Sequence, residues 1–152
     1  MTRYQGRVVV KKVTEEGKYI NGSEAKYREE NPGKLVFDSM PEFKVWKYLT
    51  DEGIAFLYQP SINLFDGIKT TEFKDGELKT ISQRKIGYTP DFFLPDYDCY
   101  LEVKGYADEL FKLRWKLFKL KNYKGYIVFS LEEAVELLDL LKLITPEGDT
   151  SV

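Results

Sequence analysis

The fold expected for this chain follows from the stretch Tyr88-Thr-Pro-Asp-Phe-Phe-Leu-Pro-Asp-Tyr-Asp-Cys-Tyr-Leu-Glu-Val-Lys-Gly105. It is predicted to form two strands joined by a tight turn at residues 95–98. Alternate side chains of a strand share a face, so Glu102 and Lys104 are expected to point the same way. The turn is expected to bring Asp91, on the first strand, across from Glu102 on that face.

This arrangement suits a hard metal ion. Asp91 and Glu102 supply the oxygen ligands that Mg²⁺ prefers, the Val103 carbonyl is a candidate third ligand, and Mn²⁺ is expected to substitute for Mg²⁺. Such a metal lowers the pKa of a bound water and neutralises charge in the transition state of phosphodiester hydrolysis. Lys104 is the candidate for orienting that water or stabilising the developing charge. The alternative is a solvated strand face, because Glu-x-Lys is a common surface pattern. The apolar neighbours favour a site, because charges on a central strand are costly unless they are paired or bound to metal.

The composition excludes several other chemistries. The chain has 152 residues, the size of one ordinary domain, and a net charge of -2. It contains no histidine, which excludes Ser-His-Asp and Cys-His catalysis, histidine-ligated zinc and a histidine base. Cys99 is the only cysteine, so an internal disulfide and a cysteine zinc cluster are excluded, and an intracellular, cytoplasmic location is the default expectation. No apolar run approaches the roughly 20 residues that span a bilayer, so no membrane association is expected.

The order of predicted elements is helix, several antiparallel strands, helix, strand and helix. This order favours an α/β domain with a mixed central sheet flanked by helices, preceded by an N-terminal β-hairpin extension. The expected parts are a hairpin or arm at 1–36, a main domain at 37–144 and a flexible tail at 145–152. Capping and turn signals predict helices over 39–53, 108–121 and 131–143, turns at 15–17 and 66–67, and a hairpin at Asp75-Gly76 between 70–73 and 78–81. Strands are expected at 7–13 and 18–20.

The quoted stretch, with the upstream helix start Ser39-Met-Pro-Glu42, resembles the PD-(D/E)xK nuclease superfamily and in particular small phage endonucleases and Holliday-junction resolvases. The resemblance covers about residues 37–130. It implies a restriction-endonuclease-like core, DNA as the partner and a phage origin. It also implies Asp91 and Glu102 as metal ligands, Lys104 as the catalytic lysine and Glu42 as a further acid of the site.

Glu42 has two interpretations. Ser39 and Glu42 stand at the spacing of a capping box, in which the glutamate only satisfies the start of a helix. Alternatively, Glu42 turns toward the metal, directly or through water. The sequence leaves both interpretations open.

The helix after Gly105 is rich in lysine. Lys112, Lys116 and Lys119 fall on one face, with Arg114 nearby, and these four are the candidates for contacts with DNA phosphates. The alternative is an ordinary solvated face. The predicted apolar stripe on the opposite side consists of Leu110, Leu113, Leu117 and Leu120.

The expected function is therefore that of a Mg²⁺-dependent DNA endonuclease. The alternatives are a non-catalytic nucleic-acid-binding or assembly module that retains the fold, and a structural protein with a coincidental motif. Degenerate members usually lose the lysine or an acid, whereas this chain keeps Asp91, Glu102 and Lys104. If the substrate is a four-way junction, a homodimer is expected, because two strands must be cut symmetrically.

Overall fold

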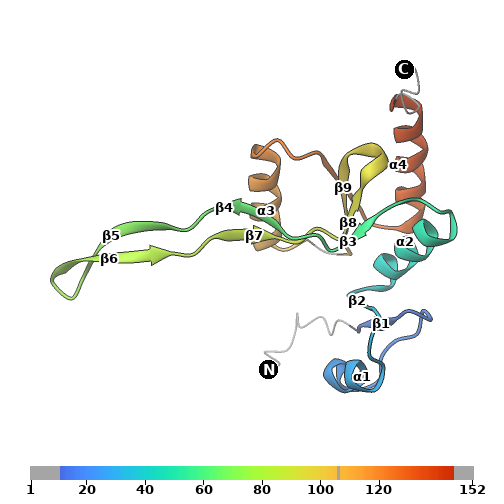
Figure 1. The fold of residues 1–152 in the computed structure, drawn as a ribbon, viewed down its shortest axis with the longest axis horizontal. Helices are drawn as coiled ribbons and strands as arrows, with labels where there is room; N and C mark the ends of the chain where they lie inside the picture. Colours follow the sequence, from blue (N-terminus) through green and yellow to red (C-terminus); the bar gives the residue numbers. More distant parts are fainter. Residues whose placement is uncertain (1–10, 106, 146–152) are drawn as a thin grey trace, which may run out of the picture. The chain divides into compact units, whose positions relative to one another are not determined.

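The computed structural model describes residues 11–105 and 107–145 of the chain. These described residues form two compact units that contain four α-helices and several β-sheets (Figure 1). The α/β class predicted from the sequence is confirmed at this level. Unit 1 comprises residues 11–55, 103–105 and 128–145, and unit 2 comprises residues 56–102 and 107–127.

Unit 1 begins with a small β-structure. β1 (Val13–Thr14) pairs antiparallel with β2 (Val36–Phe37). The predicted turn and return strand are partly present, because the Thr14 amide donates to the Lys18 carbonyl and Val13 bridges Tyr19. Of the strand predicted at 7–13, residues 7–10 lie outside the described residues. The expected domain boundary between residues 36 and 37 falls inside β2, and the division into an arm and a main domain stays a prediction. Of the expected tail at 145–152, only Thr145 is described.

One helix was not expected. α1 (Glu24–Glu30) starts at the cap Ser23 and has no buried residue. Two i,i+4 ion pairs within the helix, Glu24–Arg28 and Lys26–Glu30, stabilise its helical conformation. A helix that is polar all round lacks the apolar periodicity from which helices are predicted.

The two larger helices of unit 1 begin as their sequences predict. α2 (Met40–Asp51) starts after Ser39 and α4 (Leu131–Ile144) starts after Ser130, and each serine hydroxyl accepts a hydrogen bond from the backbone amide three residues on. The two helices contact each other. Buried residues on them and on the small β-structure form the core of unit 1: Val13, Phe37, Phe43, Val45, Leu49, Ala134, Leu138 and Leu141.

Unit 2 holds nearly all of a four-stranded sheet in the order β10-β9-β8-β3. Its strands are β3 (Leu57–Tyr58), β8 (Phe92–Leu94), β9 (Cys99–Val103) and β10 (Gly125–Val128). β8 pairs antiparallel with both β3 and β9. β10 follows β9 through the helix α3 (Glu109–Leu120). The amides of Tyr100 and Lys104 donate to the carbonyls of Lys124 and Val128. This constant offset indicates parallel pairing of β9 and β10.

The turn between β8 and β9 is a short 3-10 helix, η1 (Pro95–Tyr97), which ends at Asp98 in the left-handed region (φ 48°). The turn predicted at 95–98 is therefore confirmed. The continuous strand predicted over 88–94 is wrong. β7 (Ile86–Tyr88) ends before Pro90 and belongs to another sheet, because proline lacks the amide that a continuing ladder needs.

Residues 62–88 of unit 2 form a long two-stranded ribbon. β4 (Ile62–Phe65) pairs with β7, and β5 (Ile68–Lys74) pairs with β6 (Glu77–Gln83). Asp75 and Gly76, both at positive φ, form the predicted hairpin turn. The turn predicted at Asp66-Gly67 does not reverse the chain. A Cβ at Gly67 would lie 2.7 Å from the Gln83 carbonyl oxygen, so glycine is needed there for close approach of the two strands.

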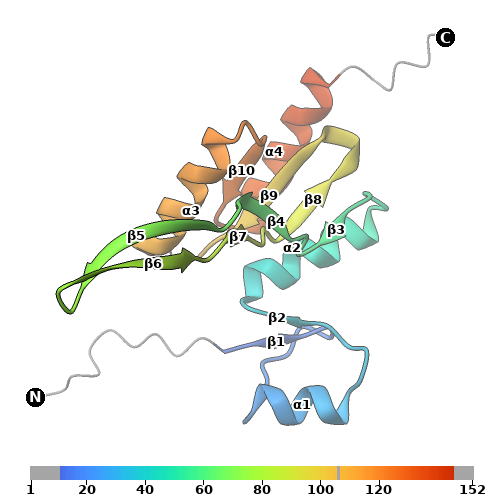
Figure 2. The same ribbon diagram turned by 60° about the vertical axis from the view of Figure 1, so that its left-hand side comes forward.

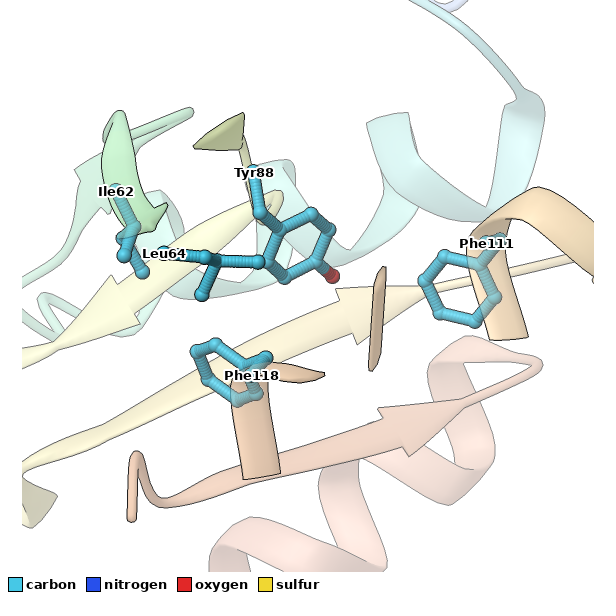
Figure 3. Close-up of a cluster of buried hydrophobic side chains, with 5 residues drawn as sticks. All are labelled: Ile62, Leu64, Tyr88, Phe111 and Phe118. Atoms are coloured by element: carbon cyan, nitrogen blue, oxygen red, sulfur yellow. The ribbon is translucent and has the colours of Figure 1, made fainter. Parts of the chain in front are cut away.

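α3 packs its aromatic side chains into unit 2. Phe111 and Phe118 are buried together with Ile62, Leu64 and Tyr88 (Figure 3). Trp115 stacks on both phenylalanines of the helix. The predicted apolar stripe is wrong for Leu110, Leu113 and Leu120, which are exposed. The aromatic residues at i, i+4 and i+7 take the core face instead, because each buries more apolar area than a leucine.

Candidate metal centre

Asp91 and Glu102 come together at the open end of the β8–β9 hairpin, the end away from its turn. The register pairs Phe92 with Leu101, so Asp91 is the next residue opposite Glu102. Directly opposite residues of an antiparallel pair lie on the same face with their Cβ atoms about 5 Å apart. The Asp91 amide donates a hydrogen bond of 3.2 Å to Oε2 of Glu102. Asp91 is 7% exposed and Glu102 is 3% exposed, so two carboxylates lie side by side in the interior.

Glu102 lies on a strand that is covered on both faces. β9 runs between β8 and β10, and four of its five residues are buried. By strand alternation Glu102 shares a face with Tyr100, whose ring contacts Phe118 edge-on. The carboxylate therefore sits beside the aromatic cluster of α3, where an uncompensated charge is costly.

Tyr88 completes this group, and sequence analysis assigned it no role. Its hydroxyl donates a hydrogen bond of 2.7 Å to the same Glu102 Oε2. Figure 3 shows its ring within the apolar cluster and its hydroxyl directed away from Ile62 and Leu64. Burial raises the pKa of the Tyr88 hydroxyl, and the negative charges of Glu102 and Asp91 raise it further. Tyr88 is therefore a fixed hydrogen-bond donor. The feature of the sequence that could have indicated this role is the position of a tyrosine, whose hydroxyl can donate a hydrogen bond, three residues before Asp91.

The backbone also holds Asp91 in place. Its carbonyl accepts a hydrogen bond of 2.7 Å from the Gln59 amide, and its own amide is held by Glu102. Gln59 has φ 50°, a left-handed conformation that is uncommon outside glycine. Buried Pro90 fixes the backbone immediately before Asp91. These restraints keep the carboxylate on the side of the sheet where Glu102 lies.

The side-chain donors that the structure brings together here are the two carboxylates of Asp91 and Glu102. Within residues 11–105 and 107–145, no three Asp, Glu or Cys side chains form a group able to hold a metal ion. Mg²⁺ is commonly bound by one or two carboxylates and fills its remaining positions with water and phosphate oxygens, so Asp91 and Glu102 fit this ion. Cys99 is fully buried, and burial raises the pKa of its thiol to about 11, so it stays a thiol at neutral pH.

Glu42 and Lys104 belong to unit 1. Glu42 accepts a hydrogen bond from the Asp38 amide, as Glu133 does from Phe129 at the start of α4. Both glutamates thus satisfy a helix start, but Glu133 is exposed whereas Glu42 is only 2% exposed. Lys104 follows the last residue of β9 and is partly exposed. That Glu42 and Lys104 join Asp91 and Glu102 in one site stays a prediction.

The four basic residues predicted to contact DNA differ in their surroundings. Lys112 pairs with Glu109 at 3.2 Å. Lys119 donates to the Gly125 carbonyl and lies over the Trp115 ring. Arg114 and Lys116 are exposed, and neither forms an ion pair with another residue in the described part of the chain. Arg114 and Lys116 are therefore the members of this set whose charges are not compensated within the described structure.

No helix in the described part of the chain has the length and apolar character needed to cross a lipid bilayer. Comparisons of the chain with models of protein families, with curated proteins and with solved structures found no match.

Proposed function

We propose that this protein is a Mg²⁺-dependent endonuclease that hydrolyses phosphodiester bonds of DNA. The observation that carries the proposal is the buried pair Asp91 and Glu102, joined by a hydrogen bond from the Asp91 amide to Glu102 Oε2. Two adjacent carboxylates in the interior repel each other and lose their hydration. A divalent cation between them offsets the repulsion, and two carboxylates are a ligand set typical of Mg²⁺.

The residues of the chain have distinct roles in this proposal. Asp91, Glu102 and the Val103 carbonyl hold the metal, and Glu42 contributes directly or through a water. Tyr88 orients Glu102 through its hydrogen bond, as partners behind metal ligands commonly do. Bound Mg²⁺ supplies Lewis acidity toward the phosphate and lowers the pKa of water. Lys104 stabilises the negative charge that develops on the phosphate or orients the attacking water.

Support for DNA as the substrate is separate from support for the metal. It comes from the exposed cations Arg114 and Lys116 on α3, which follows β9 in the chain, and from the resemblance of the sequence to PD-(D/E)xK nucleases. The restriction-endonuclease-like core, a phage origin and action in the bacterial cytoplasm belong to the same proposal. If the substrate is a four-way junction, the active form is a homodimer.

Nuclease assays test the proposal. The wild-type protein is incubated with supercoiled, linear, single-stranded and four-way-junction DNA in Mg²⁺, in Mn²⁺ and in chelator. Asp91→Asn, Glu102→Gln and Lys104→Met are compared with Asp98→Asn, which removes an exposed carboxylate from the same hairpin. We expect metal-dependent cleavage by the wild type and Asp98→Asn. Each site variant is expected to be slower by at least about 100-fold, because loss of one group that stabilises transition-state charge typically has this effect.

Two results would contradict the proposal. Cleavage that continues in chelator, or site variants that cut as fast as Asp98→Asn, would remove the metal centre from the mechanism. Metal-independent binding of DNA without any cleavage would instead favour the non-catalytic nucleic-acid-binding module.

A further inference from the structure

The hairpin of β5 and β6 is largely exposed. None of residues 68–83 is buried, and in both views the hairpin extends away from β4 and β7, the strands that carry it (Figures 1 and 2). A two-stranded hairpin without packing on a third element is at best marginally stable in water. A long exposed hairpin therefore contributes little to the folding of unit 2, which points to a role outside the fold.

The two faces of this hairpin differ in charge. On one face, Glu72 stands opposite Lys79, and Lys74 stands opposite Glu77. Each lysine of this face therefore has a carboxylate directly across the strand pair, an arrangement that is favourable, and Lys79 also pairs with Asp75. The other face carries no carboxylate, and its side chains are Lys69, Thr71, Phe73, Leu78, Thr80 and Ser82. We call this second face the uncompensated face.

The uncompensated face ends in an apolar pair. Phe73 and Leu78 are directly opposite each other beside the Asp75-Gly76 turn, and they are 72% and 76% exposed. Two large apolar side chains displayed together at the tip of an arm are unfavourable in water. Such a pair becomes favourable when a partner covers it.

Positive charge gathers nearer the base of the ribbon. Lys69, Arg84 and Lys85 are exposed, and none of them forms an ion pair with another residue in the described ranges. Of the acids of the hairpin, Asp75 pairs with Lys79 and Glu72 accepts a hydrogen bond from the Thr70 hydroxyl. Three uncompensated cations therefore lie between the apolar tip and Tyr88, the residue that hydrogen-bonds Glu102.

We infer that the β5–β6 hairpin is a DNA-binding arm, an inference that rests on the proposed function. Lys69, Arg84 and Lys85 contact phosphates, and Phe73 and Leu78 pack on base edges in the major groove, which admits a two-stranded ribbon. Ten residues separate Leu78 from Tyr88, or about 33 Å of extended strand at roughly 3.3 Å per residue. The tip therefore reaches about one helical turn of DNA from the candidate metal centre.

The charges of the hairpin also favour DNA over a second copy of the chain as its partner. In a symmetric pair of arms, the same face of each copy would meet the other. That face carries no carboxylate, so a second copy would offer the cations of the arm no opposite charge. DNA phosphates provide the opposite charge along the same length.

Binding experiments test the arm. Affinity for a duplex of about 40 base pairs, long enough for several helical turns, is measured in chelator over a range of salt concentrations. The triple variant Lys69→Ala/Arg84→Ala/Lys85→Ala is expected to bind at least about tenfold more weakly, and its slope of log K against log salt should fall by about 2–3. Phe73→Ser/Leu78→Ser is expected to weaken binding with an unchanged slope. The matched control, Lys74→Ala/Lys79→Ala, removes cations from the compensated face and should change affinity less than about twofold.

The outcomes separate this inference from the proposed function. If the wild type cuts DNA with Mg²⁺ but both arm variants bind as the wild type does, the arm is not a DNA contact and the nuclease proposal stands. If the Phe73→Ser/Leu78→Ser variant changes only the oligomeric state in sedimentation, the tip binds a second copy and the inference is overturned. If the wild type binds no DNA, both proposals fail. Circular dichroism and urea unfolding verify that each variant is folded.

Discussion

Tyr88 joins the apolar core of unit 2 to the candidate metal centre. Its ring packs with Phe111 and Phe118, and its hydroxyl donates to the Glu102 carboxylate. The ring accounts for the burial of Tyr88, whereas only the hydroxyl distinguishes it from phenylalanine. A substitution that removes the hydroxyl alone therefore separates packing from the positioning of Glu102.

Tyr88→Phe is expected to lower the free energy of unfolding by about 1.5–3 kcal/mol, the usual contribution of a hydrogen bond to a charged group. Urea unfolding monitored by tryptophan fluorescence provides the measurement. The control is Tyr123→Phe, because Tyr123 stacks on Phe118 in the same cluster and its hydroxyl forms no hydrogen bond within the described residues. Equal unfolding curves for the two variants would mean that the Tyr88 hydroxyl does not stabilise Glu102.

At the residue scale the sequence predicted the central pair but not its surroundings. Strand alternation and the turn at 95–98 were enough to bring Asp91 opposite Glu102. The role of Tyr88 depends on the chain leaving one sheet at Pro90 and entering another, which is a tertiary feature. A capping role for Glu42 was one of two interpretations that the sequence left open, and its carboxylate accepts a hydrogen bond from the Asp38 amide, while its burial follows from packing that no local pattern encodes.

At the scale of elements, Gly125 shows how closely α3 packs on the start of β10. A Cβ built at Gly125 would lie 2.7 Å from Cε1 of Phe118 and 2.9 Å from Trp115. Phe118 is fully buried, so its ring has little room to move. The aromatic face of the helix therefore requires a glycine on the strand below it.

Gly125→Ala is expected to destabilise the protein by about 1–3 kcal/mol through overpacking of this contact. The control is Gly87→Ala in β7, where a Cβ would meet only the Ile62 carbonyl oxygen at 3.5 Å, an ordinary contact. Both substitutions lower the entropy of the unfolded chain similarly, so the difference between them reports the steric term. Thermal unfolding of the two variants side by side measures it, and equal melting temperatures would contradict the packing described for α3.

Elements with local signals were predicted well. The serine caps located the starts of α2 and α4, and Asp75-Gly76 located the hairpin turn. The apolar stripe of α3 was assigned to leucines because their spacing is helical, but Phe111, Trp115 and Phe118 share a face by the same rule and bury more area. Helical spacing alone does not choose between two apolar faces.

At the scale of the whole molecule, the net charge of -2 conceals a local distribution of cations. The exposed cations that lack ion pairs within the described residues include Arg114 and Lys116 on α3 and Lys69, Arg84 and Lys85 on the ribbon. These five belong to unit 2, which contains Asp91 and Glu102, and unit 1 also has exposed lysines without ion pairs in the described residues, at Lys18, Lys44 and Lys142. The net charge does not reveal this distribution, because only the strand register shows that one face of the hairpin lacks acids.

The most direct test of the metal centre is to locate the metal in crystals of the full chain grown or soaked with Mn²⁺. An anomalous difference map reports manganese wherever it binds in the molecule. We predict its strongest peak between the carboxylates of Asp91 and Glu102, within about 2.0–2.4 Å of an oxygen of each, and no such peak in crystals of Asp91→Asn. A strongest peak elsewhere, with none between these two side chains, would contradict the account.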